Sequence, residues 1–178
     1  DLDGTLIDTA PDLMAAHDHV MQKYGRNKKK LSDIKTLASR GAWVMMQRSF
    51  KEEINDEKTK KKMVSEFIDF YAKNINNDSK PIKGIFNFLN WAKSKNISMN
   101  VCTNKKEFLA IDLLKKINMY KHFDYVAGAD TFEFNKPDPR HLTNIVEIVG
   151  GNLNKTIMIG DSEVDAMSAH NAQIPFIL

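Results

Sequence analysis

Apolar side chains between residues 11 and 79 recur at the spacing of an α-helix. Two such faces are visible, and each places its apolar members three, four or seven residues apart, on one side of a helix. No convincing strand pattern lies in this stretch, so we predict a small all-helical unit. The two faces consist of Leu13, Ala16, His17 and Val20, and of Met63, Phe67, Phe70 and Tyr71.

A helix-initiation signal precedes the first of these faces. Thr9 stands three residues before Asp12, the spacing of a capping box, and Pro11 lies early in the first turn, where proline is tolerated. These residues predict a helix that starts just after Thr9.

From residue 81 onward, the pattern changes to strands that alternate with helices. Helices are expected over 85–92, 108–115, 139–149 and 163–171, and strands over 97–102, 125–127, 156–159 and 175–178. Such alternation predicts an α/β fold with a doubly wound parallel-sheet (Rossmann-like) core. We assign residues 1–10 and 80–178 to this core and 11–79 to the helical insertion. Because no strand precedes Asp1 and no helix follows Leu178, we expect both ends to be truncations of a longer protein.

Composition narrows the class of protein. The 178 residues are 42% hydrophobic, enough for a packed core, and the net charge of +3 is too small to imply a nucleic-acid partner. A single cysteine, Cys102, excludes an intramolecular disulfide framework and fits a reducing compartment. No apolar run reaches the roughly 18 residues of a membrane helix, and no signal peptide is visible. We therefore expect a soluble cytoplasmic protein without a membrane partner.

Ligands of doubly wound sheets bind at the carboxyl ends of the strands, so the residues that follow each strand are candidates for chemistry. At the first such place, Asp1 and Asp3 stand two residues apart and Gly4 allows a sharp turn. One carboxylate can attack phosphorus while its neighbour handles the leaving-group proton. An Asp-rich turn without chemistry is the ordinary alternative for this motif alone.

Two further strand ends carry groups that suit a phosphate. Thr103 and Asn104 follow the strand over 97–102, where a hydroxyl and the following amides can bind phosphoryl oxygens. Lys136 precedes Pro137 and can place a compact positive charge over the pocket. Taken singly, these are also the patterns of a helix cap and of a surface lysine.

The motif at the fourth strand end is the most specific of the four when each is considered alone. Asp161 and Asp165 follow the apolar strand over 156–159 and lie one helical turn apart on one face. Magnesium prefers oxygen ligands, typically one or two carboxylates together with water and substrate phosphate. These aspartates therefore predict a magnesium site.

In this order, the four motifs resemble those of the haloacid dehalogenase-like superfamily, and the chain is similar to its phosphoglycolate phosphatase group. The resemblance rests on Asp1-x-Asp3-Gly4-Thr5, on Thr103, on Lys136 and on Gly160-Asp161-x3-Asp165, with further similarity along most of the chain. It implies a phosphatase for a small-molecule phosphate ester, in which residues 11–79 form a helical cap.

The resemblance also implies a role for each residue. Asp1 would become an aspartyl-phosphate and Asp3 would act as acid and then base, while Thr103, Asn104 and Lys136 would hold phosphoryl oxygens. Magnesium would be held by Asp1, the Asp3 carbonyl and Asp161, with Asp165 orienting these ligands. Arg40 and Gly41 correspond to a cap loop that selects the substrate, and Arg40 could bind a carboxylate such as that of 2-phosphoglycolate. An exposed arginine at a helix start is the ordinary alternative.

Several other functions remain open from the sequence. A phosphosugar mutase of the beta-phosphoglucomutase type shares the fold and intermediate, but usually has Glu-Asp where this chain has Gly160-Asp161. A haloacid dehalogenase would lack an acid at the place of Asp3. A non-catalytic regulator could use the pocket to bind a phosphorylated ligand. A receiver domain would need neither the second acid nor the helical insertion.

Overall fold

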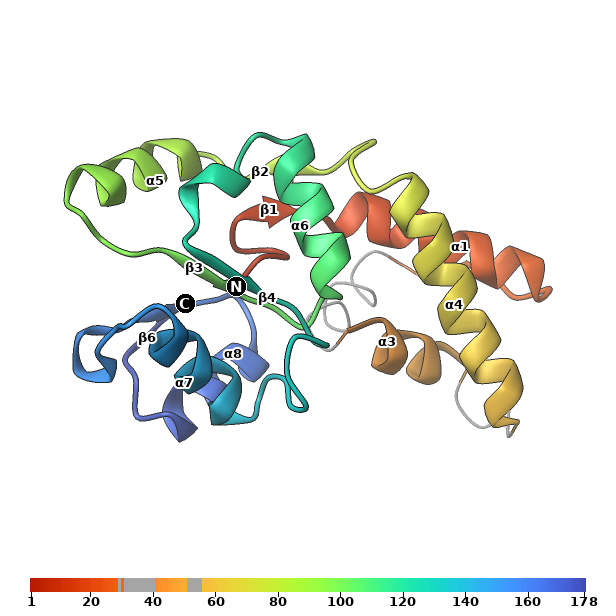
Figure 1. The fold of residues 1–178 in the computed structure, drawn as a ribbon. Helices are drawn as coiled ribbons and strands as arrows, with labels where there is room; N and C mark the ends of the chain where they lie inside the picture. The colour runs from red at the N-terminus through yellow and green to blue at the C-terminus, as the bar shows by residue number, and fades with distance from the viewer. Residues whose placement is uncertain (29, 31–40, 51–55) are drawn as a thin grey trace. The chain divides into compact units, whose positions relative to one another are not determined.

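The computed structural model describes residues 1–28, 30, 41–50 and 56–178, which form two compact units (Figure 1). One unit consists of Asp1–Asp8 and Lys80–Leu178, and the other is Thr9–Ser79. The chain thus leaves the first unit after Asp8 and returns to it at Lys80.

The described secondary-structure elements of the second unit are all helices. It contains α1 (Ala10–Lys23), α3 (Gly41–Phe50) and α4 (Glu57–Lys73), and α4 packs against both of the others. The apolar faces predicted from the sequence supply its core, except that Phe70 is half-buried and stacks on His19 at a ring-centroid distance of 4.2 Å. The buried residues of the three helices include Leu13, Ala16, Val20, Met45, Met46, Met63, Phe67 and Tyr71.

The capping box predicted at the start of α1 is wrong. Thr9 occupies the N-cap position, but its side chain makes no capping hydrogen bond. The buried carboxylate of Asp12 instead accepts hydrogen bonds from the backbone nitrogens of Asp78 (3.0 Å) and Ser79 (2.8 Å) and from the Ser79 hydroxyl (2.6 Å). Asp12 is therefore used to tie the two ends of the unit together.

The strands of the first unit are short and form three pairs. β1 (Ile7–Asp8) pairs with β2 (Lys80–Pro81) in antiparallel fashion. β3 (Asn100–Cys102) runs parallel to β4 (Tyr125–Ala127), and β5 (Met158–Ile159) runs parallel to β6 (Phe176–Ile177). The backbone nitrogen of Asp1 donates to the carbonyl of Ile159 at 2.8 Å, which brings the first residues of the chain beside β5.

Helices alternate with these strands, as the sequence predicts. They are α5 (Ile85–Ser94), α6 (Glu107–Lys116), α7 (Pro139–Ile148) and α8 (Glu163–Asn171), with short 3-10 turns η2 (Tyr120–His122) and η3 (Leu153–Lys155). In Figure 1, α6 and α7 lie on opposite sides of the β3–β4 pair, and both pack against it. One core joins β3, β4, β5, α7 and α8 through Cys102, Ala127, Leu142, Ile145, Met158, Ala169 and Ile174.

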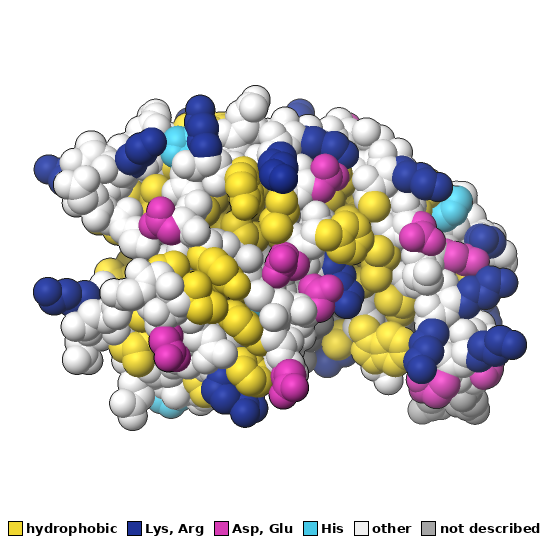
Figure 2. All heavy atoms as spheres, viewed as in Figure 1, with side chains coloured by type: hydrophobic (Ala, Val, Ile, Leu, Met, Phe, Trp, Pro, Cys, Tyr) yellow, Lys and Arg dark blue, Asp and Glu magenta, His cyan; other side chains and the backbone are white. Residues whose placement is uncertain are grey.

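The described surface carries charged side chains of both signs (Figure 2). On the face drawn in Figure 2, Lys and Arg side chains are interspersed with Asp and Glu over its described residues. Within the part of the chain that the structure describes, no helix is both long and apolar enough to cross a membrane. Cys102 lies in the core, where burial raises the pKa of its thiol, as expected for an inert packing residue.

Candidate active site

The first six residues form a tight turn that begins beside β5. Gly4 has a left-handed backbone (φ +84°), and its nitrogen donates to the carbonyl of Ile7 at 2.8 Å. This backbone conformation is strained for residues with a side chain, which explains the glycine between Asp3 and Thr5. The turn leaves Asp1 and Asp3 at its start, with Asp3 bridged to Ile7.

Lys136 joins two aspartates from distant parts of the chain. Its ammonium nitrogen lies 2.8 Å from Asp1 Oδ1 and 2.5 Å from Asp165 Oδ1. All three side chains are at most 4% exposed. Charged groups that are this buried are stable only when they are paired, so the three residues form one interdependent network.

Asp165 is held from both sides because it also caps its own helix. Its Oδ2 accepts hydrogen bonds from the backbone nitrogen (3.1 Å) and hydroxyl (2.6 Å) of Ser162, the N-cap of α8. Gly160 allows this close packing, since a Cβ at that position would lie 2.5 Å from the Asp165 Cβ. Both carboxylate oxygens of Asp165 are therefore engaged with protein groups.

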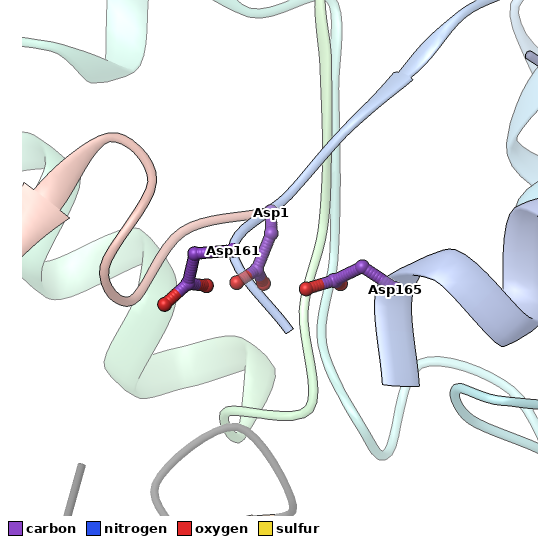
Figure 3. A group of neighbouring side chains, drawn as sticks. All are labelled: Asp1, Asp161 and Asp165. Carbon is purple, nitrogen blue, oxygen red and sulfur yellow. The ribbon is translucent and has the colours of Figure 1, made fainter. Parts of the chain in front are cut away.

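Asp161 completes a cluster of three carboxylates. One oxygen from each of Asp1, Asp161 and Asp165 lies within 4.8 Å of the others. Figure 3 shows Asp1 and Asp161 side by side, with Asp165 directed toward them from the start of α8. Asp161 is the exposed member, and Oδ1 of its carboxylate accepts a hydrogen bond from the Thr5 hydroxyl at 3.3 Å.

The charges of the cluster act on each other. Partial desolvation and the nearby Asp165 carboxylate raise the pKa of Asp161. Burial opposes the ionisation of Asp165, but the charge and hydrogen bond of Lys136 outweigh it and lower the pKa of that group. A bound cation would relieve the repulsion that Asp161 experiences. The donor set of hard carboxylate oxygens suits magnesium.

The loop after β3 connects the second and third motifs. Thr103 is buried, and its nitrogen continues the pairing with β4 by donating to the carbonyl of Ala127 at 3.0 Å. The side-chain nitrogen of Asn104 donates to the Lys136 carbonyl at 3.0 Å. Asn104 therefore positions the backbone of Lys136 through its side chain.

Lys105 belongs to this site but is absent from the sequence-based prediction. The buried ammonium of Lys105 lies 2.8 Å from Asp3 Oδ1. Its only signal in the sequence is its place directly after Thr103 and Asn104, which gives no indication that its side chain reaches the first motif.

The two predicted cap residues differ in what the structure says of them. Arg40 lies outside the described residues. Gly41 is the first residue of α3 and has a left-handed backbone, with φ at +84°. Both remain predictions for substrate selection.

Comparisons with known proteins agree with this arrangement. The family model described as haloacid dehalogenase-like hydrolase matches residues 1–178. The chain belongs to this family. Among its relatives, the phosphoglycolate phosphatase of Agrobacterium fabrum is 37% identical over 179 residues, covering 99% of this chain and 77% of that protein. The phosphoglycolate phosphatase of Caulobacter vibrioides is 36% identical over 180 residues, covering 100% of this chain and 76% of that protein.

Solved structures of haloacid dehalogenase-like proteins share the fold. A structure named as a predicted phosphoglycolate phosphatase from Haemophilus somnus superposes with a TM-score of 0.91 at 24% identity, covering 99% of this chain and 81% of that one. A hydrolase of the superfamily from Geobacter sulfurreducens gives 0.74 at 22% identity, covering 99% and 82%. These structures confirm the predicted α/β core with a helical insertion, and the family model and the relatives confirm the superfamily and the hydrolase class.

Proposed function

We propose that this chain is a magnesium-dependent phosphatase that hydrolyses a small phosphate monoester, with 2-phosphoglycolate as the favoured substrate, through an aspartyl-phosphate on Asp1. The observation that carries the proposal is the buried Asp1–Lys136–Asp165 network with Asp161 beside it. It brings together a nucleophile, a cation for phosphoryl oxygens and oxygen ligands for a metal. The names of the bacterial relatives support the substrate.

The aspartates of the cluster would have different roles toward magnesium. Asp1 and Asp161, together with the backbone carbonyl of Asp3, would hold the ion. Because both oxygens of Asp165 contact Lys136 or Ser162, Asp165 would orient the other ligands and not bind the metal itself. When bound, the ion supplies positive charge that offsets the negative charge of the phosphoryl group and its nucleophile.

The first chemical step transfers the phosphoryl group to the protein. Asp1 attacks phosphorus in line, a bond forms between its carboxylate oxygen and phosphorus, and the bond from phosphorus to the substrate oxygen breaks. Asp3 donates its proton to that departing oxygen. Lys136 has three N–H donors, and its contacts with the described residues, Asp1 and Asp165, use two of them, so the third would bind a phosphoryl oxygen. Thr103 and the Asn104 amide would hold the others.

The second step regenerates the protein. Asp3 accepts a proton from a water molecule as the water oxygen attacks phosphorus. The bond between phosphorus and Asp1 then breaks, which releases inorganic phosphate and the free Asp1 carboxylate. Asp3 therefore starts each turnover protonated and recovers its proton from water at the end.

Gly160 favours this hydrolase over the mutase alternative. A Cβ at residue 160 would approach the Asp165 Cβ and Cγ to 2.5 Å. The glutamate that usually precedes the aspartate in mutases of the beta-phosphoglucomutase type would thus require Asp165 to move. Such a movement would break the contact that holds Lys136.

For substrate choice, the proposal assigns Arg40 and Gly41 to the helical unit acting as a cap. Arginine binds carboxylates through two parallel hydrogen bonds, and 2-phosphoglycolate carries one carboxylate beyond its phosphate. We expect Arg40→Lys to raise KM for 2-phosphoglycolate more than for a sugar phosphate that lacks a carboxylate.

The experiment that tests the function measures phosphate release from 2-phosphoglycolate and a panel of sugar phosphates, with magnesium or with EDTA. The wild-type chain should turn over in magnesium only, and Asp1→Asn should abolish turnover while preserving the fold by circular dichroism. Folded wild-type protein that releases no phosphate from any ester would disprove the proposal.

A further inference from the structure

A second buried lysine contacts the acid of the first motif. Lys105 is 8% exposed as a residue, and its ammonium nitrogen lies 2.8 Å from Asp3 Oδ1. The two side chains are 4% and 10% exposed. Removing an ammonium group and a carboxylate from water costs several kcal/mol each, so a contact this buried fixes the position of both partners.

The backbone of Lys105 is itself fixed on both sides. Its nitrogen donates to the Thr103 hydroxyl oxygen at 3.1 Å, and its carbonyl accepts from the nitrogen of Ala129 at 2.8 Å. Gly128 packs so closely against this loop that a Cβ there would lie 2.7 Å from the Lys105 carbonyl oxygen and 2.2 Å from the nitrogen of Glu107. The lysine side chain therefore extends toward Asp3 from a rigid base.

The two buried lysines hold different acids. Lys136 contacts Asp1 and Asp165, which belong to the nucleophile and metal side of the site, whereas Lys105 contacts Asp3. Because the ammonium donates to Oδ1 of Asp3, that oxygen acts as an acceptor. The contact thus fixes the orientation of the Asp3 carboxyl group.

We infer that Lys105 is a positioning residue, which orients the Asp3 carboxyl group for proton transfer to the departing oxygen of the substrate. This inference rests on the proposed function and adds to it a residue outside the four motifs. A displacement of about 1 Å at a proton-transfer group can cost on the order of a hundredfold in rate, so the loss of this contact should be visible in the kinetics.

The test compares two substrates whose leaving groups differ in whether they must be protonated as they depart. The departing alkoxide of 2-phosphoglycolate requires protonation, whereas p-nitrophenolate, from p-nitrophenyl phosphate, leaves without it. We expect Lys105→Met to lower kcat/KM for 2-phosphoglycolate by roughly 10- to 100-fold and for p-nitrophenyl phosphate by less than about threefold, since general acid catalysis contributes about 10²–10⁴-fold. The ratio kcat/KM is used because it reports the first phosphoryl transfer and not the later hydrolysis.

Three further variants make the result decisive. Lys105→Arg, which keeps the charge, should recover part of the loss on 2-phosphoglycolate. Lys106→Met is the matched control, because Lys106 is half-exposed and pairs with Asp130 at 3.3 Å. This variant should leave kcat/KM unchanged for both substrates. If Lys105→Met fails to fold, Lys105→Gln carries the same test, with the same unequal losses expected.

Equal losses on both substrates in folded protein would overturn the inference while the proposed phosphatase stands. Wild-type protein that hydrolyses neither substrate would overturn the proposed function, and the inference with it.

Discussion

The absence of a side chain at residue 4 determines how closely the first turn approaches Asp161. A Cβ on Gly4 would lie 2.2 Å from Asp161 Oδ2, and the backbone there has φ at +84°. We expect Gly4→Ala to lower stability by about 1–2 kcal/mol through the left-handed backbone. By displacing Asp161, it should also reduce magnesium-dependent kcat/KM at least about tenfold.

Gly84→Ala provides the control for this change. Gly84 has nearly the same backbone conformation, with φ at +87°, but no heavy atom lies within 4 Å of a Cβ built there. The Gly84→Ala variant should lose about as much free energy of unfolding as Gly4→Ala, measured by urea denaturation, and should keep its activity. Full activity in Gly4→Ala would show that the glycine is not needed to keep Asp161 in place for turnover.

His141 makes the stability of the first unit sensitive to acid. The side chain is fully buried on α7, and this burial, together with the charge of Lys136, lowers its pKa to about 4 from an ordinary value of 6.5. The unfolded chain therefore binds a proton at a higher pH than the native state does. The contribution of His141 to the free energy of unfolding is complete above about pH 6.5 and is lost as the pH falls toward 4.

We expect the free energy of unfolding to fall by about 2 kcal/mol between pH 7 and pH 5 because of this histidine. Urea denaturation at the two pH values would measure the fall, which should be smaller in His141→Phe. His170→Gln, at an exposed position on α8, should behave as the wild type does. The same fall in all three proteins would exclude His141 as its source.

The start of α1 depends on a contact with the other end of its own unit. The buried Asp12 carboxylate accepts three hydrogen bonds from Asp78 and Ser79, and its removal would leave buried donors without an acceptor. Asp12→Ala should therefore cost roughly 2–4 kcal/mol, and Asp12→Asn, which keeps one acceptor oxygen, should cost less. Chemical denaturation would measure both. Asp69→Ala, at an exposed position on α4, should have little effect, and an equal loss there would contradict this account.

The sequence predicted best those elements whose stabilising contacts join residues close together in the chain. Helix α8 coincides with its predicted range because Ser162 and Asp165 cap it within three residues of each other. The start of α1 just after Thr9 was predicted correctly, but the role of Asp12 was misread because its partners lie more than sixty residues away. The strand expected over 97–102 is shorter, Asn100–Cys102, since its length is set by three pairs with β4. The β1–β2 pair had no periodic signal at all, with two residues in each strand.

Across the whole molecule, the order of the four motifs was enough to predict that they meet. Parallel strands end on one edge of a sheet, so Asp1, Lys136 and Asp165 could be expected to lie together, and the structure joins them within 2.8 Å. The Lys105–Asp3 contact could not be expected, because the direction of one long side chain has no signature in hydrophobic spacing.

Magnesium should stabilise the folded chain as well as support turnover. A ligand that binds only the native state at a hundred times its Kd adds about 2.7 kcal/mol, and the clustered carboxylates lose mutual repulsion when a cation binds. We expect magnesium chloride to raise the Tm of the wild type, measured by calorimetry. Asp161→Asn should lose most of this shift. Sodium chloride of equal ionic strength is the control, and an equal rise with sodium would argue against a specific site.

The antiparallel pairing of Asp8 with Lys80 makes the helical insertion equivalent to the loop of a β-hairpin. Its two ends are about 5 Å apart in the first unit, the distance that a two-residue turn also spans. Each doubling of a flexible loop costs only about 0.6 kcal/mol, so we expect the β1–β2 pair to tolerate changes in the length of the segment between its strands. We accordingly expect the pairing of β1 with β2 to survive when the segment between these residues is lengthened, exchanged or replaced by Asn-Gly. Mutation and recombination can therefore alter the inserted segment while the residues of the first unit stay in register.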